Sequence, residues 1–111
     1  MNEIHDGIQS VNEYIGKLPT GCYVIATMLK ENHINQAMQN IHHFSEGLEW
    51  LATAVLLLQQ NDIVCHLNLE QIYPLLDQVN KGLEEKKYLQ VASIFEKKIA
   101  VFFNEITVFN N

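Results

Sequence analysis

The sequence predicts an all-α protein, an antiparallel bundle of four main helices, and two observations carry this prediction. Apolar residues recur at alternating intervals of three and four in at least three segments, which is the period of a helix face packed against other helices. Alternating runs of β-branched residues separated by turn signals, which strands would need, are absent. With 111 residues and 48% hydrophobic content, we expect residues 1–111 to form one domain around one core.

The first helix is expected at about residues 3–17. Its apolar residues fall at intervals of 4, 3, 4 and 3, and they are Ile4, Ile8, Val11, Ile15 and Leu18. The segment 18–21, Leu-Pro-Thr-Gly, is expected to end this helix in a turn, because proline lacks a backbone donor and disfavours helix at the preceding residue. A short helix would follow over 22–31, and the sequence leaves open whether it counts as a fifth helix.

A long central helix is expected at about 33–60, with Ser45 or Gly47 as the place where it would bend. From Leu48 to Leu58 only Glu49 and Thr53 interrupt the apolar residues. A helix that is apolar nearly all round is normally buried, and this run is too short to cross a bilayer, which needs about 20 residues. We therefore expect the other helices to wrap around this one, and we expect no contact with a membrane.

The second half of the chain predicts two more helices. Residues 62–67 are ambiguous between a loop and one packed turn, and Asn68 with Gln71 resembles a capping box. The next helix either bends at Pro74 or begins nearer Tyr73, and it should end near Gly82; its stripe is Leu69, Ile72, Leu76, Val79 and Leu83. A last helix at about 85–108 is predicted by the stripe Tyr88, Ala92, Phe95, Ile99, Phe102, Ile106 and Phe109.

Charge and composition exclude several classes of function. The net charge is −6 and the chain contains no arginine, so we expect no nucleic-acid partner, because such partners require a basic face. Gly-rich phosphate-binding motifs are absent, and neither cysteine has the electropositive setting of a reactive thiol. We therefore expect a protein that is not an enzyme and needs no cofactor. Residues 1–6 show no basic region followed by an apolar one, as a secretory signal would, so we expect a cytoplasmic protein with Cys22 and Cys65 as buried free thiols.

One cluster on the central helix suggests an alternative function. His42, Glu46 and Glu49 would share one face of the helix, and imidazole and carboxylate groups are ligands of divalent metals. Di-iron bundles use paired Glu-x-x-His elements, whereas the order here is His-x-x-Glu, from His43 to Glu46, in a single copy. A metal-binding bundle that uses these three residues is the alternative hypothesis.

Apolar residues that are in excess of the core predict a protein-binding surface. Phe102 and Phe103 are adjacent, so one of them must point away from the main stripe of the last helix. We expect Val101, Phe103 and Val108 to form an apolar edge there, with Trp50 as a second anchor. The main hypothesis is a non-catalytic helical bundle that acts through protein–protein contacts, either with a partner protein or by self-association.

Two segments resemble known proteins. Residues 81–99 (Lys-Gly-Leu-Glu-Glu-Lys-Lys-Tyr-Leu-Gln-Val-Ala-Ser-Ile-Phe-Glu-Lys-Lys-Ile) resemble a helix-turn-helix segment of small cytoplasmic helical bundles from Gram-positive bacteria and, more distantly, of flagellar export chaperones. Residues 46–51 (Glu-Gly-Leu-Glu-Trp-Leu) are similar to an element of the same bundles. The resemblance implies a non-enzymatic bundle that dimerises or holds a helix of a partner.

Overall fold

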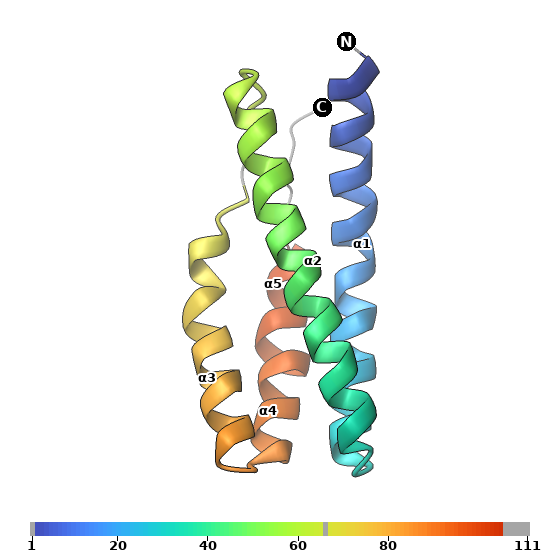
Figure 1. The fold of residues 1–111 in the computed structure, drawn as a ribbon, viewed down its shortest axis with the longest axis vertical. Helices are drawn as coiled ribbons and strands as arrows, with labels where there is room; N and C mark the ends of the chain where they lie inside the picture. Colours follow the sequence, from blue (N-terminus) through green and yellow to red (C-terminus); the bar gives the residue numbers. More distant parts are fainter. Residues whose placement is uncertain (1, 66, 106–111) are drawn as a thin grey trace.

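The computed structural model describes residues 2–65 and 67–105, with side chains from residue 5 onward, and this part of the chain is all-α (Figure 1). The helices are α1 (Asn2–Lys30), α2 (Ile34–Gln60), the short 3₁₀ turn η1 (Leu69–Gln71), α3 (Tyr73–Glu84), α4 (Tyr88–Ile94), the π-helical turn η2 (Phe95–Ile99) and α5 (Ala100–Glu105). The last three elements follow one another without a break, and we call them together the last helix (88–105). The predicted fold class is confirmed.

The helices alternate in direction along a bundle that measures 46 × 21 × 21 Å (Figure 1). α1 packs against α2 on one side and against α4, η2 and α5 on the other. α3 packs against α4 rather than against α2. Within the residues that the structure describes, none of the helices is long and apolar enough to cross a membrane.

α1 continues through Pro19, so the predicted turn at 18–21 and the separate helix at 22–31 are wrong. The apolar stripe of this helix does not stop at Leu18; it continues at the same intervals, and its buried members are Val11, Ile15, Leu18, Cys22, Ile25 and Leu29. A proline inside a helix costs about 3 kcal/mol, because it removes one hydrogen bond and its ring clashes with the carbonyl group four residues earlier. Each large apolar side chain buried beyond it contributes about 1.5–3 kcal/mol, so packing of the second half outweighs the proline.

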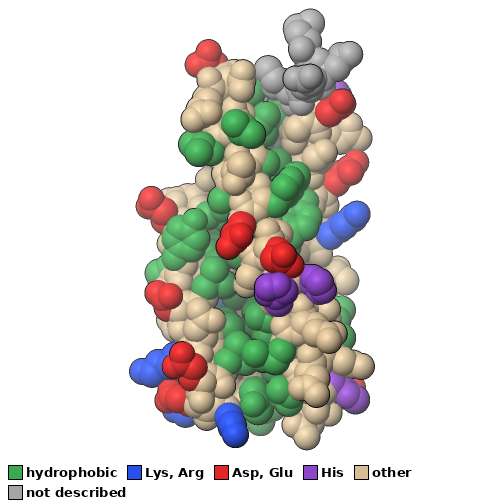
Figure 2. Space-filling view, in the orientation of Figure 1, with side chains coloured by type: hydrophobic (Ala, Val, Ile, Leu, Met, Phe, Trp, Pro, Cys, Tyr) green, Lys and Arg blue, Asp and Glu red, His purple; other side chains and the backbone are tan. Residues whose placement is uncertain are grey.

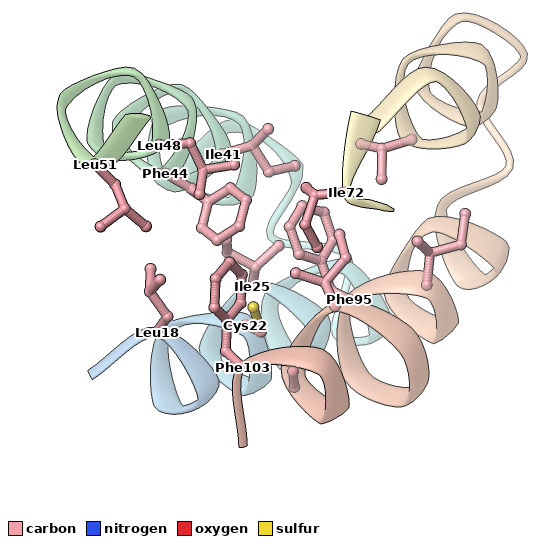
Figure 3. Close-up of a cluster of buried hydrophobic side chains, with 14 of the residues drawn as sticks. Leu18, Cys22, Ile25, Ile41, Phe44, Leu48, Leu51, Ile72, Phe95 and Phe103 are labelled. Atoms are coloured by element: carbon pink, nitrogen blue, oxygen red, sulfur yellow. The ribbon is translucent and has the colours of Figure 1, made fainter. Parts of the chain in front are cut away.

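The core forms where α1, α2 and the last helix meet. Leu18, Cys22 and Ile25 point from α1 toward the side chains of the other two helices (Figure 3). Phe44 of α2 packs edge-to-face on Phe95, with ring centroids 5.5 Å apart. The end of α1 is also held by the ion pair of Lys30 with Glu96, and the hydrogen bond from Lys30 keeps the pKa of Glu96 below its ordinary value.

The bounds predicted for α2 are confirmed, and the helix passes Ser45 and Gly47 without interruption. Its predicted burial on all sides is wrong. The buried face is one stripe, made of Ala37, Ile41, Phe44, Leu48, Leu51, Val55 and Leu58. Trp50, Leu56 and Leu57 are about half exposed, and Met38 is exposed too. Because α2 packs chiefly on α1, a single stripe is enough for its packing and the remaining apolar residues face outward.

Three residues with left-handed backbone conformation end α1, α2 and α3, and they are Asn32, Asp62 and Lys86, with φ of 64°, 65° and 58°. After α1, the Asn32 N–H donates to the Leu29 carbonyl at 3.3 Å, and the His33 N–H donates to the Met28 carbonyl at 2.8 Å. The same pair of bonds follows α2 and α3. Each helix therefore ends in a Schellman motif, which satisfies carbonyl groups that would otherwise lack a partner.

The start of α3 resolves the alternatives at Pro74. Residues 63–65 and 67–68 are loop, and the Asn68 side chain accepts a hydrogen bond from the Glu70 N–H, two residues on, rather than from Gln71. α3 begins at Tyr73 with Pro74 in its first turn, where the missing N–H has no helical partner to lose. It ends at Glu84 instead of Gly82, where the left-handed Lys86 follows. Gly82 is explained by packing between α3 and α4, because a Cβ there would lie 2.6 Å from Cγ2 of Val91.

The last helix differs from its predicted stripe after Ile99. Phe103 is 3% exposed and Phe102 only partly buried, so the expectation that Phe103 points outward is wrong. The π turn over 95–99 accommodates one extra residue per turn, which shifts the inward face from position 102 to position 103. Phe103 is thus a core residue, and an apolar edge that includes it is not formed.

Replacing Lys86 with glycine is expected to stabilise the protein by about 1 kcal/mol, because a side chain in the left-handed conformation costs about 1–2 kcal/mol that glycine avoids. The matched control is Lys81→Gly, which removes the same charge from an exposed position inside α3 and should destabilise by about 1 kcal/mol. Chemical denaturation measures both. Equal destabilisation by the two variants would contradict the Schellman motif at Lys86.

Candidate functional site

Exposed apolar side chains gather on α2 and at the start of α3. Trp50 is 46% exposed, Leu56 and Leu57 are 54% exposed, and Tyr73 is 52% exposed. Figure 2 shows hydrophobic side chains at the surface on both sides of α2. Single exposed apolar residues are ordinary, whereas several on one helix and its neighbour make this surface a candidate contact site.

A groove of about 420 Å³ lies between α2 and the η1–α3 segment. Its walls are mostly apolar and consist of Leu48, Ala52, Leu69, Ile72, Tyr73 and Leu76. Ser45, Glu49 and Thr53 supply the polar part of the lining. The groove exists because α3 packs on α4 and leaves its other side toward α2 partly unfilled.

The charge beside this groove is negative. Glu49 lines it on the α2 side, and Glu70 and Asp77 are exposed next to the lining residues Leu69 and Leu76. Lys81 and Lys87 line a different cavity, between α3 and α4. On the face drawn in Figure 2, acidic side chains lie along α2 and α3, and the lysines are mainly at the lower end. The groove therefore combines an apolar interior with an acidic margin.

Trp50, predicted as an anchor, is held in place by a contact between α1 and α2. Its ring packs edge-on against Tyr14, with centroids 5.4 Å apart. Tyr14 in turn lies over Gly47, so closely that a Cβ at position 47 would overlap the tyrosine hydroxyl. Burial raises the pKa of Tyr14, with a smaller contribution from Cys22. The glycine in the middle of α2 is thus explained by close packing, and Trp50 presents an oriented ring to solvent.

The edge predicted on the last helix is not assembled among the described residues. Val101 is 38% exposed on α5, Phe103 is buried, and Val108 lies outside the described residues. Among the described residues, Val101 is therefore the one member of the predicted edge that is exposed.

A second groove of about 420 Å³ runs between α1 and α2, where Lys17 and His43 flank the apolar Leu18, Ile25 and Phe44.

The metal ligands of the alternative hypothesis are only partly brought together. His42 Nε2 lies 3.5 Å from Glu46 Oε1, and His43 Nδ1 lies 3.6 Å from the same oxygen. In the part of the chain that the structure describes, no three His, Cys, Asp or Glu side chains converge in a way that could hold a metal ion. Glu49 instead lines the α2–α3 groove.

The two cysteines are free thiols in different settings. Cys22 is completely buried in the α1 stripe, and the resulting loss of hydration raises its pKa to about 12. Cys65 is only partly buried, so the expectation of two buried thiols is right for Cys22 and wrong for Cys65. The Cys22 thiol is therefore protonated and unreactive at neutral pH.

The α2–α3 groove was missed by the sequence analysis. The sequence predicts that the stripe of α3 with Leu69, Ile72 and Leu76 is buried against other helices, and that Ala52 belongs to a helix buried on all sides. One signal was available: Ala52 and Leu56 form a second apolar line, four residues apart, beside the buried stripe of α2. Two apolar lines on one helix indicate two packing partners, and the structure supplies one of them.

Gly47→Ala is expected to destabilise the protein, although alanine favours helix over glycine by about 1 kcal/mol, because the methyl group displaces Tyr14. In a Tyr14→Ala background the same change should become stabilising by up to about 1 kcal/mol. Thermal or chemical unfolding of the four proteins of this double-mutant cycle measures the reversal. Gly16→Ala, where a Cβ meets nothing within 4 Å, is the control and should stabilise in both backgrounds. An unchanged sign at Gly47 would contradict the contact.

Comparison with known proteins places the chain in a family. A family model described as Domain of unknown function (DUF8042) matches residues 6–108. Neither the curated proteins nor the solved structures contain a match to the chain. Because the matched range spans nearly all of the 111 residues, the chain belongs to the DUF8042 family.

Proposed function

We propose that this protein is a non-catalytic helical bundle that acts through protein–protein contacts, as an adaptor, a chaperone-like factor or a homodimer. The observation that carries the proposal is the exposed apolar surface of α2, where Trp50, Leu56 and Leu57 are each about half exposed. Trp50 and Leu57 lie seven residues apart on the same side of the helix, and we name these two residues the α2 face. The resemblance of residues 46–51 and 81–99 to small helical bundles points in the same direction.

The energetics of the α2 face suit a contact surface. Full burial of a leucine contributes about 1.5–3 kcal/mol, so covering the two half-exposed large side chains of this face would contribute on the order of 2 kcal/mol. Tryptophan is among the residues that most often dominate a protein interface. Because Trp50 already packs on Tyr14, less side-chain freedom remains to be lost when a partner binds.

The settings of the two cysteines also fit this proposal. Cys22 is a poor nucleophile, since it is buried and its pKa is about 12. Neither cysteine takes part in a disulfide, which fits the reducing cytoplasm, where we propose the contact takes place. The groups around the α2–α3 groove are apolar side chains and carboxylates, which suit recognition of another protein surface.

Leu57→Asp is expected to abolish this contact without unfolding the protein, because Leu57 is exposed and the new charge would have to be buried at the interface. The tagged wild type and the variant are compared for the proteins that each retains from the native host and for self-association by analytical ultracentrifugation. Trp50 is the single tryptophan and reports contact by a blue shift of its emission.

Gln60→Asp is the matched control, since it places the same charge at an exposed position near the end of the same helix. The proposal predicts that Leu57→Asp loses at least 90% of the retained partner or dimer while Gln60→Asp keeps it. Two results would contradict the proposal: equal retention by a folded Leu57→Asp protein, or a wild type that retains nothing and stays monomeric.

A further inference from the structure

We infer that the α2–α3 groove receives an amphipathic helix with a basic polar face from a partner protein. The inference rests on the proposed function and adds the chemistry of the partner. It differs from the α2 face in location, because the groove lies between α2 and the η1–α3 segment and includes residues of both. Three features of the groove carry it: its length, its apolar interior and its charge.

The length of the groove suits a helix. Its lining on α2 extends from Ser45 to Thr53, and the exposed Leu56 lies one turn beyond Ala52 on the same side. At about 1.5 Å per residue, positions 45 to 56 span roughly 16 Å, which is about three turns of a bound helix. A guest helix with apolar residues at positions i, i+3 or i+4, and i+7 presents a stripe of this length.

The interior of the groove favours an apolar stripe over a polar one. Leu69, Tyr73 and Leu76 are the accessible apolar side chains of the lining, with Leu48 and Ile72 buried beneath. Ala52 is small enough to let a guest side chain approach the α2 backbone. The Thr53 hydroxyl already donates to the Glu49 carbonyl oxygen at 3.1 Å, so it needs no partner from a ligand. An apolar stripe that enters here therefore does not leave the Thr53 hydroxyl unsatisfied.

The negative charge beside the α2–α3 groove favours a partner helix with basic residues. Glu49 lines the groove, and Glu70 and Asp77 are exposed neighbours of its lining residues Leu69 and Leu76. Within the described residues, none of the three carboxylates has a cationic side chain within 4 Å. Lysines on a guest helix could therefore pair with them without breaking an existing ion pair. Complementary charge at the margin of an interface mainly increases the association rate and the selectivity.

The same charge disfavours a second copy of this chain in the groove. Each copy carries a net charge of −6, and the lysines Lys81 and Lys87 line a cavity on the other side of α3. Bringing two acidic grooves together would place like charges side by side. A basic helix avoids this repulsion, which is why we assign the groove to it.

Three labelled synthetic peptides of 16 residues test the inference by fluorescence anisotropy. The first has leucines at helical spacing and lysines on the other face, the second has glutamates in place of the lysines, and the third has the composition of the first in scrambled order. We expect the first peptide to bind at least tenfold more tightly than the other two, and increasing salt to weaken its binding.

Variants locate the binding. Ala52→Trp fills the groove and should weaken binding of the first peptide at least tenfold; Leu56→Asp, at an exposed position, should do the same without inserting a side chain among packed ones. Glu49→Lys and Asp77→Lys should each weaken it several-fold. Glu13→Lys makes the same charge change on the exposed side of α1 and should have no effect. Circular dichroism and thermal unfolding verify that each variant is folded.

Failure of this inference can be told apart from failure of the proposed function. Equal binding of all three peptides, no binding of the first, or an equal effect of Glu49→Lys and Glu13→Lys would overturn the basic-helix inference. A dimer that Ala52→Trp dissociates would also overturn it, because a second copy would then fill the groove. In each case, loss of a partner or dimer on Leu57→Asp would still support the proposed function.

Discussion

The apolar stripe of α1 is the interaction on which the rest of this structure depends. Its residues, from Val11 to Leu29, contact α2 on one side and the last helix on the other. Those two partners also meet each other at Phe44 and Phe95. Figure 3 shows the α1 side chains Leu18, Cys22 and Ile25 at the junction of the three helices. α1 is thus the shared neighbour that joins the long helices into one core.

Dependence on α1 explains why the bundle has an open side. α2 and the last helix both bury their main apolar stripes against α1. α3 buries its own stripe against α4, with Gly82 in contact with Val91. Nothing in this arrangement requires α2 and α3 to close on each other, so a groove remains between them. We connect two features with function, the α2 face and the groove. Both are apolar surfaces that are not buried in the core.

Much of the fold could be predicted from the sequence, because the period of apolar residues identifies helices and their inward faces. The bounds of α2 follow from it directly, and the start of α3 at Tyr73 is one of the two alternatives that Pro74 left open. Two local features could not be predicted. The continuation through Pro19 depends on tertiary packing that outweighs a local preference, and the π turn at 95–99 moves the inward face from Phe102 to Phe103 without any mark in the residue pattern.

The candidate site was predictable only in part. Trp50 is exposed as an anchor should be, and Val101 is exposed on α5, whereas Phe103 is buried. The groove escaped prediction because an apolar stripe shows that a residue packs against something, without showing which pair of helices closes and which stays apart. Ala52 and Tyr73 are separated by 21 positions in the chain, and only the three-dimensional arrangement brings them to one groove.

Thiol exchange at Cys22 tests the central claim about α1 most directly, because this residue lies in the stripe just beyond Pro19 and is completely buried. The measurement uses a Cys65→Ala protein, so that Cys22 is the only thiol, and follows its reaction with a disulfide reagent across denaturant concentrations. If α1 is the shared core helix, the free energy of opening at Cys22 equals the free energy of global unfolding. Labelling through an opening far smaller than global unfolding would show that the second half of α1 detaches by itself, and would contradict the account.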